Sequence, residues 1–273
     1  MMADNPQKAT VSGYAEIIGF LIKAEIAFII IRLAASIRFT GGIFAELFHT
    51  ALFVLVIFAY IRESAKRQGL TLQECRITPF RCNKQDVLRA VGIITIVMSV
   101  IAIIAGGIRP TGIDPSNLAY ISLLNFIQSS VGSGIGEELF FRGYLFKRVE
   151  EKSNWKAAVI LTSIFFGLGH IFGGITPAHM FFSFVGSASL GALFSVMTYK
   201  HGTIWSSVLI HMCMNSKERL IGFSESSSLF VFDFVNIPIE VQSSIAWGVI
   251  SLVSVIVILI DLRTLGITNK KCS

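Results

Sequence analysis

Apolar runs of about 20 residues follow one another along almost the whole chain, and mostly short polar links separate them. A helix needs roughly 20 mostly apolar residues to cross the hydrocarbon core of a bilayer. Eight segments meet this length, so the sequence predicts an all-α membrane protein, a polytopic bundle of about eight transmembrane helices. The predicted spans are residues 14–37, 42–61, 87–108, 118–146, 155–173, 178–199, 203–221 and 241–262.

The balance of residue types supports a chain that lies in a membrane. Hydrophobic residues make up 53% and charged residues 15%, whereas soluble domains have about 25% charged residues. No internal repeat or soluble segment is visible, so residues 1–273 are expected to form one integral membrane domain. The net charge of +6 comes from clusters between the apolar runs, without a nucleic-acid-binding motif, so no nucleic-acid partner is expected.

The Lys and Arg residues predict the orientation, because they concentrate in cytoplasmic loops. The densest cluster, in residues 62–89, follows the second span, and alternation then places both termini in the cytoplasm. Residues 222–240 hold no Lys or Arg and are predicted to be external, with their aromatic side chains resting on the membrane surface. Lys23, Glu25 and Arg32 interrupt the first span, which leaves a partly interfacial amphipathic helix as the alternative there.

Polar side chains inside three of the spans are the strongest sign of function, because charge at bilayer depth is costly, rare and usually functional. They are Glu137, Glu138 and Arg142 on the fourth span, His170 on the fifth, and His211 with Asn215 on the seventh. Glu138 and Arg142 are four residues apart, so they share a helix face and can pair. His211 and Asn215 have the same spacing and project in one direction.

Depth in the membrane predicts that these groups meet. At ~1.5 Å per residue, Glu137 lies roughly 15 Å from Lys147, and His170 roughly 21 Å from Lys156. On the same count His211 and Asn215 lie roughly 15–20 Å beyond Lys200. Gly132 and Gly136 just before the acids, like Ser187 and Gly191 on the sixth span, are small residues that allow helices to approach closely.

These groups fit the hydrolysis of an amide bond without a covalent intermediate. With Glu138 held by Arg142, Glu137 can act as a general base in an apolar cavity. His170 can hold the same water, while His211 and Asn215 can donate hydrogen bonds to an oxyanion. The Glu138–Arg142 pair also has a purely structural interpretation, as an intramembrane ion pair.

The order Glu137-Glu138-x-x-x-Arg142, Phe166-x-x-x-His170 and His211-x-x-x-Asn215 resembles the CPBP family over about residues 118–216. That family groups type II CAAX prenyl endopeptidases with prokaryotic intramembrane proteases and bacteriocin-immunity proteins. The resemblance implies an intramembrane glutamic-type endopeptidase with Glu137 as base, His170 as its partner on the water, and His211 with Asn215 as the oxyanion site. Residues 118–221 would form the catalytic core.

The expected setting follows from this resemblance. The protein would be integral to a prokaryotic cell membrane and would act on a peptide or membrane-protein substrate, with or without a lipid anchor. No cofactor and no metal are expected.

Two other functions stay open. One is a zinc protease with His170, His211 and Glu137 as ligands, although the HExxH spacing is absent. The other is a transporter or immunity protein without catalysis, in which the intramembrane charges bind a peptide or a proton. Sensitivity to a chelator would favour the first, and function preserved after Glu137→Gln would favour the second.

Overall fold

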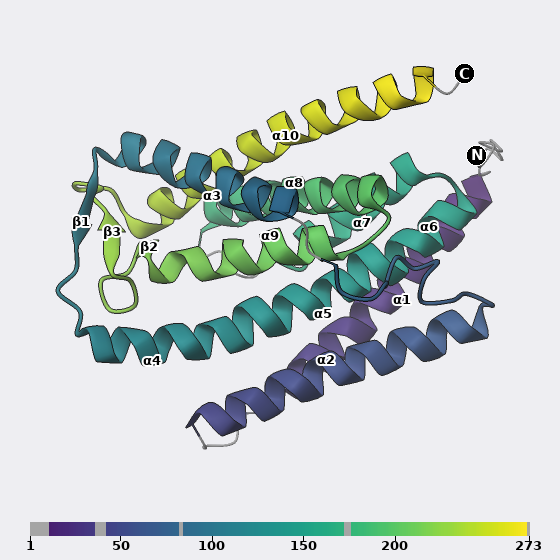
Figure 1. Ribbon diagram of the computed structural model, residues 1–273, viewed down its shortest axis with the longest axis horizontal. Helices are drawn as coiled ribbons and strands as arrows, with labels where there is room; N and C mark the ends of the chain where they lie inside the picture. The colour runs from purple at the N-terminus through teal and green to yellow at the C-terminus, as the bar shows by residue number, and fades with distance from the viewer. Residues whose placement is uncertain (1–10, 36–41, 82–83, 172–175, 272–273) are drawn as a thin grey trace.

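The computed structural model describes residues 11–35, 42–81, 84–171 and 176–271 and forms a bundle of helices (Figure 1). The long helices are α1 (Val11–Ala35), α2 (Gly42–Arg67), α3 (Lys84–Ala105), α8 (Pro177–His201) and α10 (Ile239–Lys271). By length and composition, four described segments could cross a membrane: Ile43–Arg67, Lys84–Ala105, Pro177–His201 and Ile239–Thr264. The predicted all-α membrane fold is confirmed, and the protein is an integral membrane protein.

The prediction of eight complete spans is not confirmed, because two helices end earlier than expected. The helix α7 (Trp155–Leu168) has 14 residues and α9 (Trp205–Ser216) has 12. At ~1.5 Å per residue they extend for about 21 and 18 Å, which is short of a hydrocarbon core of about 30 Å. Gly169 follows α7, and the 3₁₀ turn η4 (Lys217–Arg219) follows α9.

The helix α1 is continuous through the charges that interrupt its sequence. Ile17, Leu21, Ala24 and Phe28 form one buried face along it. Large apolar side chains on its other faces, such as Ile22 and Ile30, are exposed. This helix therefore packs on the bundle along one side, and whether it crosses the bilayer stays a prediction.

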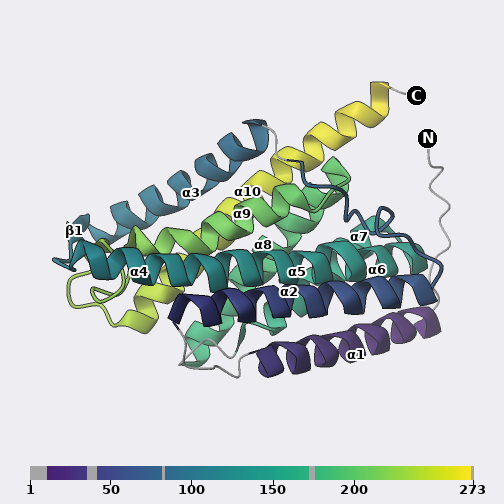
Figure 2. The same cartoon turned by 60° about the horizontal axis from the view of Figure 1, so that its bottom comes forward.

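The fourth predicted span lies within a long rod that changes its helical form several times (Figure 2). In order, the rod contains α4 (Pro115–Asn125), the π-helix η1 (Phe126–Ser133), α5 (Gly134–Glu138), the π-helix η2 (Leu139–Leu145) and α6 (Phe146–Lys152). π-helical turns are rare and occur frequently at functional sites. The two glutamates thus stand on a single short α-helical segment between two π-helical ones.

The glycines of this rod set how closely its neighbours approach. A Cβ atom at Gly136 would lie 2.5 Å from Cε1 of Phe53 on α2, and one at Gly134 would lie 2.9 Å from Cγ of Met212 on α9. Real Cβ atoms essentially never sit this close to other heavy atoms, so a side chain at either position would force Phe53 or Met212 to move. The predicted close approach of helices at these small residues is present, and it brings α2 and α9 against the two sides of α5.

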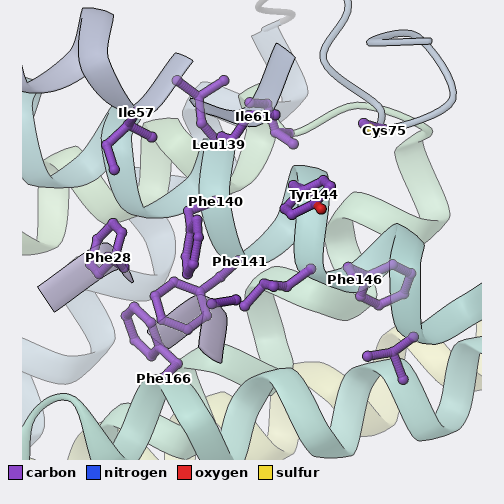
Figure 3. Packing of buried hydrophobic residues seen from close by; sticks show 14 of the residues in the cluster. Phe28, Ile57, Ile61, Cys75, Leu139, Phe140, Phe141, Tyr144, Phe146 and Phe166 are labelled. Carbon is purple, nitrogen blue, oxygen red and sulfur yellow. The ribbon is translucent and has the colours of Figure 1, made fainter. Parts of the chain in front are cut away.

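Two clusters of buried apolar residues hold the bundle together. The first joins α1, α2, α6, α7 and η2, and Figure 3 shows Phe28 of α1 beside Phe140 and Phe141 of η2, with Phe166 of α7 close by. The second joins α3, α8, α9, α10 and the strand β3. Arg142 lies between these clusters, because its guanidinium stacks on Phe166 of the first and Phe194 of the second.

A small sheet closes one end of the bundle, which the sequence did not predict. Its strands are β1 (Ile108–Pro110), β2 (Ile221–Gly222) and β3 (Phe230–Phe232), in the order β1-β3-β2. Val231 and Phe232 are buried, and Phe223 lies 5.2 Å from Phe232 between ring centroids. Phe232 is buried in the bundle and so does not reach the membrane surface, while the predicted contact of the remaining aromatic side chains of residues 222–240 with that surface stays a prediction.

The start of α1 and the end of α10 are both at the end of the bundle opposite the sheet, on different sides of it (Figures 1 and 2). Asp261 of α10 is buried there and accepts hydrogen bonds from Arg89 of α3 and Lys200 of α8. These ion pairs fasten three helices at the end that carries the predicted cytoplasmic charge. The side of the membrane on which this end lies remains a prediction, and residues 1–10 and 272–273 are outside the described part.

Candidate active site

Glu138 and Arg142 form an ion pair in the interior of the protein. Both side chains are 0% exposed, and Nη1 of Arg142 donates a hydrogen bond of 3.1 Å to Oε1 of Glu138. Removing one partner of such a pair leaves a buried charge and costs about 3–5 kcal/mol. The pair is therefore a fixed part of the architecture.

Aromatic rings enclose the guanidinium of Arg142. Its Cζ lies 4.2 Å from the ring centroid of Phe166 on α7, 5.2 Å from that of Phe194 on α8 and 5.6 Å from that of Phe141. A Cβ atom at Gly191 of α8 would lie 3.1 Å from Nη2 of Arg142, so glycine makes the space for this side chain. Stacking on aromatic faces stabilises a cation that few hydrogen-bond acceptors reach.

His211 connects the two glutamates. Its Nδ1 lies 2.9 Å from Oε1 of Glu138, a hydrogen bond in which the ring N–H donates to the carboxylate. Its Nε2 lies 3.9 Å from Oε2 of Glu137. Phe194 stacks on the imidazole at 5.3 Å between ring centroids. The ring is thus held in one orientation, with Nε2 toward Glu137.

His170 is positioned by the phenylalanine of its own motif. Its Nδ1 donates a hydrogen bond of 2.8 Å to the carbonyl oxygen of Phe166, and the two rings are 4.6 Å apart. A carbonyl can only accept, so the proton of a neutral ring sits on Nδ1 and Nε2 is the acceptor. The carbonyl oxygen of Phe166 therefore fixes the tautomer of His170, and the ring of Phe166 packs against the guanidinium of Arg142.

A small pocket, partly open beside the exposed Ile29 and Gly169, brings Glu137 and His170 together. Its volume is about 30 Å³, enough for one water molecule. Glu137 is 2% exposed, and Phe141 and Phe166 form apolar parts of the wall. The cavity therefore presents a carboxylate and an imidazole to the same water-sized space.

Glu25 of α1 lines the same cavity and is the residue whose role the sequence analysis missed. A Cβ atom at Gly169, next to His170, would lie 3.2 Å from Oε1 of Glu25. Phe28, one turn along α1, stacks on Phe140 at 4.6 Å between ring centroids and anchors the helix here. The position of Glu25 within an apolar run could have indicated a functional residue. Only the packing of α1, however, shows that the side chain lies beside His170.

Asn215 lies apart from this cavity, one turn beyond His211 on α9. Its Nδ2 donates a hydrogen bond of 2.7 Å to the carbonyl oxygen of Ser129 in η1. Its side chain lines a second, larger cavity. The structure thus places Glu137, Glu138, Arg142, His170 and His211 around one centre and Asn215 at its edge.

A metal site has little support from the arrangement of these ligands. Among the residues that the structure describes, no group of three His, Cys, Asp or Glu side chains is placed to hold one metal ion. Nδ1 of His211 and Nδ1 of His170 are both occupied by oxygen acceptors. The only ring nitrogens left to bind a metal at the two histidines are the Nε2 atoms.

Comparison with known proteins identifies the part of the chain that carries the motifs. Residues 119–216 match the family model described as Type II CAAX prenyl endopeptidase Rce1-like. The matched residues include all three polar motifs and the helices α5, α7, α8 and α9 that position them. No curated protein matches the chain. Over residues 119–216 the chain is therefore similar to the type II CAAX prenyl endopeptidases.

Proposed function

We propose that the protein cleaves a peptide bond within the membrane by means of a water molecule that Glu137 activates. The observation that carries this proposal is the cavity that Glu137 and His170 share, which has room for one water molecule. The catalytic core would be residues 118–221 within the single membrane domain of residues 1–273. The substrate would be a peptide or a membrane protein, with or without a lipid anchor.

Glu137 acts as the general base in this scheme. It takes a proton from the water as the water oxygen bonds to the scissile carbonyl carbon, and Nε2 of His170 accepts the second hydrogen bond of that water. The carbon–nitrogen bond of the resulting tetrahedral intermediate then breaks. Glu137 gives its proton to the leaving amine, so that one amide and one water become an acid and an amine.

His211 stabilises the oxyanion of the intermediate. Glu138 accepts a hydrogen bond of 2.9 Å from Nδ1–H and stabilises positive charge on the ring, as the carboxylate does in a catalytic triad. An N–H at Nε2 then faces the reacting carbonyl on the Glu137 side. Hydrogen bonds to an oxyanion in such a water-poor site contribute several-hundred-fold in rate, on the order of 10²–10³ each.

Glu138 and Arg142 position His211 without touching the substrate. The guanidinium keeps the Glu138 carboxylate charged in the interior, and the rings of Phe166 and Phe194 keep the guanidinium in place. Asn215 becomes a second oxyanion donor once substrate binding breaks its hydrogen bond to Ser129.

Cleavage of a quenched-fluorescent peptide library by the purified protein in detergent tests the proposal. Wild type, Glu137→Gln and His211→Ala are compared with and without a strong zinc chelator. Cleavage that survives the chelator and is lost in both variants is the expected result. Loss with the chelator in wild type would instead support a zinc protease. Cleavage that persists in Glu137→Gln would overturn the assignment of the base.

A further inference from the structure

Ser187 of α8 carries a buried hydroxyl group that the chemistry derived above does not use. The side chain is 1% exposed, and its Oγ has no hydrogen-bond partner among the described residues. A buried polar group without a partner destabilises the folded protein. Alanine would allow helices to approach just as closely without this cost, so the hydroxyl group needs a separate explanation.

Other serines of the long helices show how this cost is usually avoided. The hydroxyl group of a helical serine can donate to the carbonyl oxygen four residues earlier. Ser189 of α8 donates such a hydrogen bond to Val185 at 2.8 Å, and Ser244 of α10 donates one to Glu240 at 2.6 Å. Within the described part of the chain Ser187 makes no bond of this kind, so its hydroxyl group is available to a bound molecule.

The neighbours of Ser187 on α8 show which way its side chain points, because residues four apart lie on one helix face. One turn earlier, Oγ of Ser183 donates a hydrogen bond of 3.0 Å to the carbonyl oxygen of His170. One turn later, a Cβ atom at Gly191 would lie 3.1 Å from Nη2 of Arg142. Ser187 therefore lies on the face of α8 that contacts the catalytic centre, at a depth between these two contacts.

The same face of α8 also contacts the imidazole of the proposed oxyanion site. Phe194, two turns after Ser187, stacks on His211 at 5.3 Å between ring centroids. At about 100° per residue, the directions of Phe194 and Ser187 around the helix differ by only about 20°. The hydroxyl group of Ser187 is thus directed to the region between His170 and His211, which is where the proposed function places the scissile carbonyl.

We propose that the Ser187 hydroxyl group donates a hydrogen bond to the oxygen of the scissile carbonyl and forms the oxyanion site together with His211. The inference rests on the proposed function and adds a catalytic residue to it. The hydroxyl group keeps its proton, and the nucleophile remains the water that Glu137 activates. Asn215 must first give up its hydrogen bond to Ser129, whereas the described residues offer Ser187 no bond that it has to break. A donor that needs no rearrangement as the charge develops is the most effective kind.

The variant Ser187→Ala tests the proposal, because it removes the hydroxyl group and little else. For a peptide that wild type cleaves, we expect kcat to fall about 100-fold with little change in KM, since the lost bond acts mainly in the transition state. The free energy of unfolding should stay the same or rise, because a buried hydroxyl group without a partner is removed. A serine with a merely structural role would not combine lower activity with unchanged or higher stability.

Ser189→Ala is the matched control on the same helix. The Ser189 hydroxyl group donates to Val185 and lies 2.7 Å from Oγ of Ser251 on α10, so this variant should lose stability and keep kcat. A peptide phosphonamidate, which imitates the tetrahedral intermediate, gives a second measurement. Its affinity should fall in Ser187→Ala by the same factor as kcat/KM.

Three other results would overturn the inference. Equal kcat for Ser187→Ala and wild type would do so and leave the proposed function intact. Labelling of Ser187 by a fluorophosphonate, with the activity of Ser187→Ala as low as that of Glu137→Gln, would make Ser187 a nucleophile and overturn the proposed function as well. Failure of wild type to cleave any peptide of the library would overturn the proposed function, and the inference with it.

Discussion

Replacement of Arg142 by Met removes a cation that is 0% exposed and leaves the equally buried carboxylate of Glu138 without it. Breaking a buried pair from one side costs about 3–5 kcal/mol. For a chain of this size that corresponds to a fall in melting temperature of roughly 6–20 °C. Glu138→Gln should cost a similar amount, because it leaves the guanidinium among aromatic rings with no counter-charge.

The double variant Glu138→Gln/Arg142→Met is the sharper part of this prediction. It removes both charges, and Gln can still accept the hydrogen bond from Nδ1 of His211. We therefore expect its loss in free energy of unfolding to be about 2 kcal/mol smaller than the sum of the losses of the two single variants. The free energy of unfolding would be measured in mixed micelles with increasing denaturing detergent.

An exposed pair on α2 provides the matched control. Glu63 and Arg67 have the same four-residue spacing and a 2.9 Å contact, but their side chains are 56% and 75% exposed. Breaking this pair should cost less than about 1 kcal/mol. The reasoning about buried charge would be refuted if Arg142→Met lost no more free energy of unfolding than the control. It would also be refuted if the losses of the two single variants added up to that of the double variant.

Three further predictions concern other parts of the molecule. Gly136→Ala should lower the free energy of unfolding by about 1–3 kcal/mol, because its Cβ would meet Phe53, whereas Gly92→Ala on α3, with nothing within 4 Å, should be neutral or stabilising. Burial raises the pKa of the Cys75 thiol to about 11, so at pH 8 it should be far less thiolate than an ordinary cysteine, and mass spectrometry should find it alkylated only after unfolding. Glu25→Leu should fill the water-sized cavity and lower kcat tenfold or more, on the order of the contribution of a positioned water. Glu25→Gln should keep most of the activity. Equal rates for the two variants would contradict the role of α1.

The helices were predictable from the sequence because their signal is local. Runs of apolar residues locate the starts of α2, α3, α8 and α10 within three residues, and the spacing of Glu138 and Arg142 predicts their ion pair without any tertiary information. Hydropathy does not report whether lipid or protein covers an apolar helix. For this reason α7 and α9, which are short and partly enclosed by neighbours, looked like complete spans.

Other features depend on contacts between segments that are distant in sequence. The rings that enclose Arg142 include Phe166 of α7 and Phe194 of α8, and the sequence around neither phenylalanine indicates that it contacts Arg142. Glu25 reads as an interruption of an apolar run until α1 is seen to pack beside His170. The three-residue strand β3 is too short to show an alternating pattern, so its aromatic residues were assigned to the membrane surface.

The residues of the three polar motifs were predicted to lie close together, and the distances in the structure test this prediction. Depth counting predicted one layer for Glu137, His170, His211 and Asn215. The structure brings the first three around one centre and separates Asn215 by a helical turn. The residue count gives only the depth of a side chain along the membrane normal. The rotation of α9 about its axis decides in which direction Asn215 points.

The central claim is that Glu137 takes the proton from the attacking water, and a single-turnover measurement tests it most directly. Excess wild type, Glu137→Gln and the surface control Glu63→Gln would each be mixed with one peptide, and binding and bond cleavage would be followed separately. The account predicts unchanged binding, an unchanged rate for Glu63→Gln, and a loss of about 100-fold or more in the cleavage step for Glu137→Gln. A loss of less than about threefold in that step, with the peptide bound normally, would contradict the account.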